Sequence, residues 1–227
     1  MPKSTIKYLD YGLTDYGKAW EMQQEIFNRQ VKLKTEKQPT ENHLIFVEHP
    51  HVYTLGKSGN SQNMLISDEM LKAINATYYK VDRGGDITYH GQGQIVGYPI
   101  FDLEAMGLTY KGYINKLEES IIQYLKKEHN IIAYQLDDAT GVWVSADRGP
   151  EKICAIGTKA SHYITMHGFA LNINTDLRYF GYINPCGFTN RGVTSLEKIK
   201  GKKFDYENEK ILLRKHIAQV FNAELVI

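Results

Sequence analysis

The chain has 227 residues, of which 42% are hydrophobic and 23% are charged, and its formal net charge at pH 7 is +1. This length suits one domain with its own hydrophobic core, which we predict over residues 1–227. The small net charge gives no reason to expect a nucleic-acid partner, and no apolar run reaches the length of a membrane span. Since "MPKSTIKYLDYG" is typical of neither a signal peptide nor a transit peptide, we expect a cytoplasmic protein.

The apolar pattern predicts more strands than helices. Helices are expected from Thr14 or Asp15 to about Lys34, over 110–128 and over about 206–222. Strands are expected at 6–12, 43–49, 77–82, 97–103 and 163–174, with a hairpin at 141–157 and a loop-rich connection at 51–65. Because a regular βαβ alternation is absent, this order favours an α+β fold in which helices pack against a sheet.

The stretch "RGGDITYHGQGQIVGYPI" (83–100) is unusually rich in glycine. The nearby "HVYTLGKS" ends like a P-loop but has His51 in place of the first glycine, and the glycines of 83–100 do not give the dinucleotide-binding spacing. Glycine lets a ligand or a second chain segment approach the backbone closely. Arg83 could then anchor an anionic or carbonyl group, and His90 could orient or transfer a proton. The alternative is a glycine-rich turn that links two strands.

The two cysteines are too few for a disulfide framework in a chain of this size. Cys186 lies between Pro185 and Gly187, a turn-forming context that could expose the sulfur and direct backbone N–H groups at an oxyanion. The alternative is a structural thiol in a loop. Cys154 lies within an apolar strand and is expected to be an inert core residue, so we favour Cys186 as the nucleophile.

A lysine and a histidine lie in the neighbouring predicted strands. Alternation places Lys152 and Cys154 on one face, where a buried ammonium would need a partner and would lower the pKa of a nearby thiol. Alternatively, Lys152 lies at the exposed end of its strand. His167 shares a face with Phe169 by the same alternation, and is either a satisfied core residue or a functional group beside Gly168.

Five segments, taken in order, resemble the lipoyl(octanoyl) transferase family. The segments are "EHPHVYTLG" (48–56), "RGGDITYHGQGQIVGYPI" (83–100), "KICAIG" (152–157), "HGFALNIN" (167–174) and "NPCG" (184–187). The run from Arg83 to Gln94 is the most specific, and the spacing between Lys152 and Cys186 is also similar to that of the family. The resemblance extends from about residue 43 to about residue 197.

This resemblance implies a mixed, mostly antiparallel sheet flanked by helices, the fold of lipoate and biotin protein ligases. It implies transfer of an octanoyl or lipoyl group from octanoyl-acyl carrier protein to a specific lysine of a lipoyl-accepting domain, the first step of protein lipoylation. The acceptor would be a lipoyl domain of a 2-oxoacid dehydrogenase complex or the glycine cleavage H protein. Neither ATP nor a metal is expected, because the substrate carries its own phosphopantetheine thioester.

The resemblance also implies roles for individual residues. Cys186 would be the nucleophile, Lys152 would lower its pKa, and His90 or His167 could transfer or orient a proton. Cys154 stands where the family is expected to have alanine or another small residue. The residues implied to bind the acyl substrate are Arg83, Gly84, Gly85, Asp86, Ile87, Thr88, Tyr89, His90, Ala155, Ile156, Gly157, Gly168, Phe169 and Ala170.

Three other functions remain open at this point. An ATP-dependent lipoate or biotin ligase of the same fold would need no cysteine. A non-catalytic acyl-binding relative would keep the pocket alone, and a hydrolase would use Cys186 with His90 or His167 and water. Basic clusters could attract acidic partner proteins or could simply be solvated; they comprise Lys32, Lys34 and Lys37, and Lys198, Lys200, Lys202 and Lys203.

Overall fold

The computed structural model describes residues 3–184 and 191–227. Within them, nine strands form one mixed sheet in the order β12-β1-β2-β6-β10-β9-β8-β7, with β11 beside β9. β1 pairs in parallel with β12 and β2, and β11 with β9, whereas the remaining neighbours are antiparallel. The strands are β1 (Ser4–Leu13), β2 (Asn42–Glu48), β6 (Gln94–Ile100), β7 (Ala133–Leu136), β8 (Ala139–Ala146), β9 (Gly149–Ser161), β10 (Ile164–Asn172), β11 (Gly192–Val193) and β12 (Ala223–Val226).

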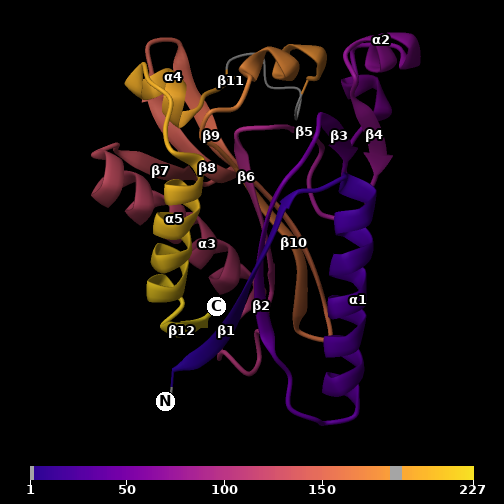
Figure 1. Ribbon diagram of the computed structural model, residues 1–227, viewed down its shortest axis with the longest axis vertical. Coiled ribbons are helices and arrows are strands. Elements are labelled where there is room, and N and C mark those ends of the chain that lie inside the picture. Colours follow the sequence, from indigo (N-terminus) through magenta and orange to yellow (C-terminus); the bar gives the residue numbers. More distant parts are fainter. Residues whose placement is uncertain (1–2, 185–190) are drawn as a thin grey trace.

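Helices cover both faces of this sheet, as Figure 1 shows: α1 lies on one face, and α3 and α5 lie on the other. The helices are α1 (Tyr16–Thr35), α2 (Asp68–Ala73), α3 (Tyr110–His129), α4 (Leu196–Lys200) and α5 (Tyr206–Val220), with short 3₁₀ turns η1 (Ser61–Asn63) and η2 (Leu177–Tyr182). The predicted α+β fold, with a mixed, mostly antiparallel sheet flanked by helices, is therefore confirmed. No helix among the described residues combines the length and apolar character that a bilayer crossing requires.

Helix α1 forms where the sequence predicts it and begins at one of the two expected caps. The Asp15 carboxylate accepts a hydrogen bond from the backbone N–H of Lys18 and so satisfies one of the free donors of the first turn. Buried positions then recur every three or four residues, including Ala19, Gln23 and Phe27. Because this spacing keeps them on one side of the helix, α1 packs along the sheet with that side.

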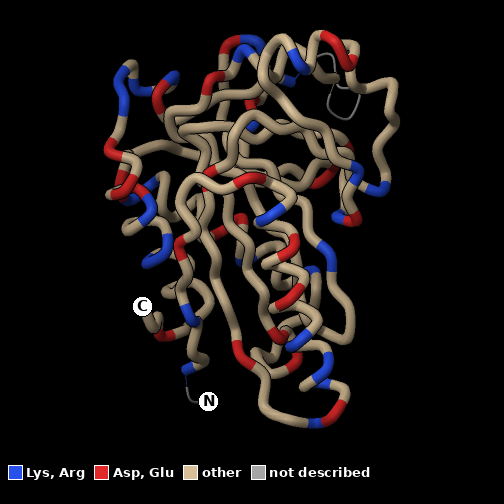
Figure 2. The backbone as a smooth tube through the Cα atoms, turned by 45° about the vertical axis from the view of Figure 1, so that its right-hand side comes forward, with Lys and Arg blue, Asp and Glu red and all other residues tan. Residues whose placement is uncertain are grey.

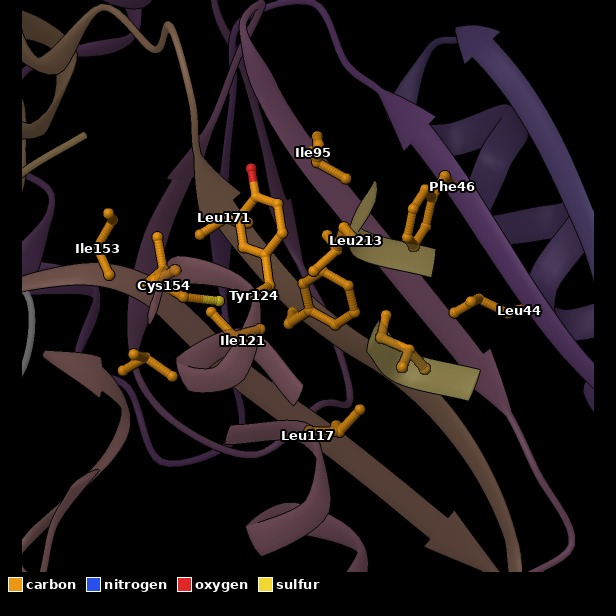
Figure 3. Close-up of a cluster of buried hydrophobic side chains, with 14 of the residues drawn as sticks. Leu44, Phe46, Ile95, Leu117, Ile121, Tyr124, Ile153, Cys154, Leu171 and Leu213 are labelled. Carbon is orange, nitrogen blue, oxygen red and sulfur yellow. The ribbon is translucent and has the colours of Figure 1, made fainter. Parts of the chain in front are cut away.

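The larger core lies between the sheet and helices α3 and α5. In Figure 3, Leu117, Ile121 and Tyr124 of α3 and Leu213 of α5 face apolar side chains of the sheet, among them Phe46. All five are fully buried. Burial of one such side chain stabilises the fold by roughly 1.5–3 kcal/mol. This packing gives the sheet a rigid back against which the site is built.

A second, three-stranded sheet consists of β4 (Thr77–Lys80), β3 (Val52–Leu55) and β5 (Ile87–His90), in that order. It lies beyond the start of α1 (Figure 1). Two expectations change here: 51–65 contains a buried strand rather than only loops, and the glycine-rich stretch contains β5 before β6 begins. Both strands are four residues long, so each is too short for its alternation to stand out. The strand expected at 97–103 begins earlier, at Gln94, and ends at Ile100.

Candidate active site

A cavity of about 700 Å³ lies where the small sheet meets β8, β9, β10 and the start of α1. This volume falls within the range of roughly 300–1,000 Å³ that is usual for small-molecule sites. The predicted residues of 83–88, His90, 155–157 and 168–170 line it, and so do Lys152 and His167. Segments that are far apart in the sequence therefore meet around one cavity.

Tyr89 is the exception among the predicted substrate-binding residues. Its ring is fully buried and lies against those of Tyr53 and Tyr179, and its hydroxyl oxygen is 2.7 Å from Nδ1 of His51. Thr88 and His90 line the cavity, so alternation along β5 turns Tyr89 away from it. Contrary to the prediction, Tyr89 belongs to the core of the small sheet.

The glycines beside the cavity allow backbone segments to approach one another. A Cβ atom on Gly157 would lie 2.9 Å from the carbonyl oxygen of Gly84, and one on Gly168 would overlap the carbonyl oxygen of Gly97. A Cβ atom cannot lie this close to a backbone oxygen, so only glycine fits at these two positions. The glycines of 83–100 thus allow close backbone contacts within the protein, and the same stretch forms part of the cavity wall.

Arg83 is buried at the wall of the cavity and donates to the protein's own oxygens. Its Nη2 donates to the carbonyl oxygen of Thr54 at 2.7 Å and to the Thr54 hydroxyl at 2.9 Å, while Nη1 donates to the carbonyl oxygen of Gly84 at 2.9 Å. Arg83 therefore ties β3 to the glycine-rich stretch. Burial lowers the pKa of both His90 and His167, and the charge of Arg83 lowers each further.

His90 belongs to a buried chain of hydrogen bonds under the cavity. Burial holds its pKa well below the usual value, so the ring is neutral at pH 7. Nδ1–H donates to Oε1 of Gln94 at 2.9 Å, and Nε2 faces the hydroxyl of Thr54 at 3.4 Å. The Gln94 amide donates in turn to Oδ1 of Asn172 at 2.9 Å. Because both ring nitrogens have partners, His90 is held as part of the wall.

His167 has a different environment. Its Nε2 lies 2.8 Å from Oδ1 of Asp82, whose other oxygen binds Lys159 at 2.5 Å. Hydrogen bonds from His167 and Lys159 hold the pKa of Asp82 well below its usual value, so this carboxylate accepts and Nε2 carries the proton. The buried Nδ1 has no hydrogen-bond partner within 3–184 and 191–227.

The backbone at His167 breaks the expected alternation of β10. Its φ angle is 59°, in the left-handed region that residues with a side chain rarely adopt. The His167 ring consequently lies near Trp20 of α1, with centroids 6.5 Å apart, whereas Phe169 packs in the core under α3 and α5. The prediction that His167 and Phe169 share a face is wrong, because alternation holds only for regularly extended backbone.

Lys152 and Cys154 are also separated by an irregularity. Cys154 pairs with Val142 and Lys152 with Trp143, so Ile153 is an extra residue in β9. Ile153 and Cys154 are both fully buried in the core, while Lys152 lines the cavity. The expectation of a common face for Lys152 and Cys154 is therefore wrong. Burial also raises the pKa of the Cys154 thiol far above its usual value, which leaves Cys154 unreactive.

Cys186, the predicted nucleophile, lies outside the described residues. The described chain on either side of 185–190 borders the cavity, through Asn184 before it and Arg191 after it. Lys152 borders the same cavity. Its ammonium group lies 3.3 Å from the carbonyl oxygen of Thr140 and 4.6 Å from the centre of the Trp143 ring.

Several residues of the site were not predicted from the sequence. The cavity is also lined by Tyr16, Tyr98, Trp143 and Asn172. Asp82 orients the His167 ring by accepting a hydrogen bond from its Nε2. Asp82 directly precedes Arg83 in the sequence, and this position beside the glycine-rich stretch is the one feature from which its place in the site could have been predicted. Among the described residues, no three His, Cys, Asp or Glu side chains converge as a group that could hold a metal.

Comparison with known proteins places the chain in a family. Residues 15–218 match the model of the lipoyl protein ligase A/B catalytic domain. The chain is 53% identical to an octanoyltransferase of Bacteroides fragilis over 86% of its own length and 89% of the relative's. It is 48% identical to an octanoyltransferase of Flavobacterium johnsoniae over 97% of its own length and 98% of the relative's.

Two solved structures share the fold at low sequence identity. A lipoate-protein ligase A bound with ATP is 12% identical, with a TM-score of 0.67 over 99% of this chain and 90% of that one. A biotin protein ligase from Aquifex aeolicus in complex with biotin and ATP is 13% identical, with a TM-score of 0.53 over 96% of this chain and 70% of that one. The family match covers most of the chain, and the identity of about half of the residues to known octanoyltransferases extends over nearly the full length of both proteins. The chain therefore belongs to the octanoyltransferases of the lipoyl protein ligase A/B family.

Proposed function

We propose that this octanoyltransferase moves an octanoyl group from octanoyl-acyl carrier protein to a lysine of a lipoyl-accepting domain, through a thioester on Cys186. The observation that supports the proposal is the cavity itself. Lys152, the residues on either side of 185–190 and the glycine-rich wall all line this one cavity. We also propose that residues 1–227 act as a single catalytic domain in the cytoplasm.

In the first step, the Cys186 thiolate attacks the thioester carbon of the octanoyl-phosphopantetheine arm. The bond from that carbon to the pantetheine sulfur breaks, the carrier leaves as a thiolate that takes the proton of the Lys152 ammonium, and the acyl-enzyme thioester remains. Lys152 favours the attacking thiolate, because a nearby ammonium lowers the pKa of a thiol. Backbone N–H groups beside Gly157 or the cysteine stabilise the oxyanion, each contributing roughly a factor of 10²–10³ in rate.

In the second step, the acceptor lysine attacks the acyl-enzyme as a neutral amine. The new C–N bond forms, the C–S bond breaks, and the amine proton passes to Lys152 or to a histidine. Nδ1 of His167 is buried and has no hydrogen-bond partner among the described atoms, whereas both ring nitrogens of His90 have one. Both steps exchange one acyl bond for another, so the proposal needs neither ATP nor a metal.

The acceptor is proposed to be a lipoyl domain of a 2-oxoacid dehydrogenase complex or the glycine cleavage H protein. The basic clusters attract acidic partner proteins only weakly, because some of their lysines form ion pairs with Asp and Glu residues of the same chain. Lys34 binds Asp102 and Glu104 at 2.9 and 2.6 Å, and Lys198 binds Glu151 at 2.9 Å. In Figure 2, basic and acidic residues are interspersed along the backbone.

Intact-mass analysis after mixing with octanoyl-acyl carrier protein tests the proposal. We expect one octanoyl adduct on the wild type and on Cys154→Ala, because Cys154 is buried in the core. We expect none on Cys186→Ala. Addition of an acceptor domain should then move the adduct to the acceptor without ATP.

The same experiment separates the alternatives. Transfer that requires ATP and survives in Cys186→Ala would indicate a ligase. Release of free octanoate in the presence of the acceptor would indicate a hydrolase, and cavity binding without any adduct would indicate a non-catalytic relative.

A further inference from the structure

The ammonium group of Lys152 lies against the face of an aromatic ring at the wall of the cavity. Lys152 Nζ is 4.6 Å from the centre of the Trp143 ring, and both residues line the cavity. The two side chains project from paired positions on neighbouring strands β8 and β9. Attraction between a cation and the face of an indole ring operates at this distance, and tryptophan gives the strongest of these interactions.

The Trp143 ring is itself held in place. Its indole N–H donates to the carbonyl oxygen of Ala139 at 3.0 Å, and the residue is almost fully buried. The guanidinium carbon of Arg191 lies 5.5 Å from the same ring centre, and Arg191 binds Asp138 at 2.5 Å. The indole is therefore a fixed surface rather than a mobile side chain.

The backbone before Trp143 also shapes the path of the lysine. A Cβ atom on Gly141 would lie 3.3 Å from Cε of Lys152 and 2.7 Å from the carbonyl oxygen of Cys154, so the lysine stem runs close over this glycine. The Gly141 N–H donates at 2.8 Å to the carboxylate of Glu118, a buried residue of α3. Burial raises the pKa of Glu118, and the Gly141 hydrogen bond and the charge of Lys152 oppose this.

We propose that Trp143 is a positioning residue for Lys152, and that its ring face fixes the ammonium group at the wall of the acyl cavity. This inference rests on the proposed function, in which Lys152 favours the thiolate of Cys186. In this role Trp143 acts through Lys152. Charged groups near the pair, among the described residues, include Glu118 of α3, Arg191 and Asp138.

The test measures how readily the reactive thiol ionises. In a Cys154→Ala background, Cys186 is the remaining cysteine of the sequence, so the pH dependence of its alkylation by iodoacetamide gives its titration midpoint. Trp143→Leu should raise this midpoint towards that of Lys152→Met and slow alkylation at pH 7 by roughly 3- to 30-fold. Trp143→Phe keeps a ring face and should raise the midpoint less.

A second lysine–aromatic pair provides the matched control. Lys116 Nζ lies 5.7 Å from the ring centre of Phe221, in the core away from the cavity lining. Phe221→Leu should lower the free energy of unfolding without moving the alkylation midpoint. Circular dichroism of each variant establishes that it is folded, and Trp143→Phe takes the place of Trp143→Leu if the latter does not fold.

The double variant Trp143→Leu/Lys152→Met decides whether the tryptophan acts through the lysine. Its midpoint should equal that of Lys152→Met alone. A further shift in the double variant, or an unchanged midpoint in Trp143→Leu while Lys152→Met shifts, overturns the inference and leaves the proposed function intact. An unchanged midpoint in Lys152→Met removes the lysine from the proposed mechanism and the inference with it.

Discussion

Nε2 of His167 lies 2.8 Å from Oδ1 of Asp82, and this contact fixes which nitrogen of the ring carries the proton. An ionised carboxylate only accepts hydrogen bonds, so Nε2 must donate and Nδ1 must keep its lone pair. His90 has the opposite arrangement, since its Nδ1–H is committed to Gln94. The two histidines of the cavity are thus chemically distinct, although both are neutral at pH 7 and both lie in glycine-rich motifs.

Asp82→Asn tests the contribution of this contact to stability. The charged acceptor of both His167 and Lys159 is lost, so we expect the free energy of unfolding at pH 7.5 to fall by about 1–2 kcal/mol, a range reduced because Asp82 is partly exposed. Urea unfolding followed by circular dichroism measures this. Asp176→Asn is the control, because Asp176 pairs with a largely exposed Arg178 and should cost under about 0.5 kcal/mol. Equal losses in the two variants would contradict the assigned role of Asp82.

The long amphipathic helices could be predicted from the sequence because their signals are local. Helix α1 is capped by Asp15, and α3 spans Tyr110–His129 against an expected 110–128. Each buries a stripe of side chains that recurs at helical spacing, and the stripe is visible without knowledge of what it packs against. The same holds for α5 (Tyr206–Val220), whose expected start is also correct.

The orientation of the site residues could not be predicted in the same way. Lys152 and Cys154 face different surroundings because Ile153 bulges out of its pairing with β8, and the bulge depends on the partner strand. His167 leaves the face of Phe169 because its φ angle is positive, next to Gly168, where the backbone of β10 lies very close to that of its neighbour β6. The family resemblance indicated which segments line the cavity, whereas these contacts between strands determine which side chains enter it.

Gly168→Ala tests whether the close approach of the paired strands β10 and β6 requires glycine. The new methyl group would overlap the carbonyl oxygen of Gly97 and approach Cδ of Pro99 at 2.6 Å, and backbone atoms in paired strands cannot move away cheaply. We expect the free energy of unfolding to fall by about 3 kcal/mol, measured by urea unfolding at pH 7.5.

Gly181→Ala is the matched control for this substitution. Nothing lies within 4 Å of a Cβ atom built there, so its stability should change by less than about 0.5 kcal/mol. A Gly168→Ala protein as stable as Gly181→Ala would show that the two strands leave enough room for alanine at position 168.

His49 should make the protein less stable in mild acid. The residue is fully buried, donates from Nδ1 to the carbonyl oxygen of Thr14 at 2.8 Å, and accepts at Nε2 from the Tyr98 hydroxyl at 2.7 Å. Burial lowers the pKa of His49 to about 4, whereas a histidine in the unfolded chain titrates near 6.5. Between these values the unfolded chain binds more protons than the folded one, so stability falls as the pH falls through this window.

His49→Gln removes that titration, and the comparison of slopes isolates it from His90 and His167, whose lowered pKa values act in the same direction. Between pH 6.5 and pH 4, the wild type should lose about 2–3 kcal/mol more of its unfolding free energy than His49→Gln does. His162→Gln, at an exposed position, should retain the wild-type slope. Urea unfolding at half-unit pH steps measures all three slopes. If His49→Gln also retained the wild-type slope, His49 would be equally protonated in the folded and unfolded chains, and burial would not lower its pKa as we infer.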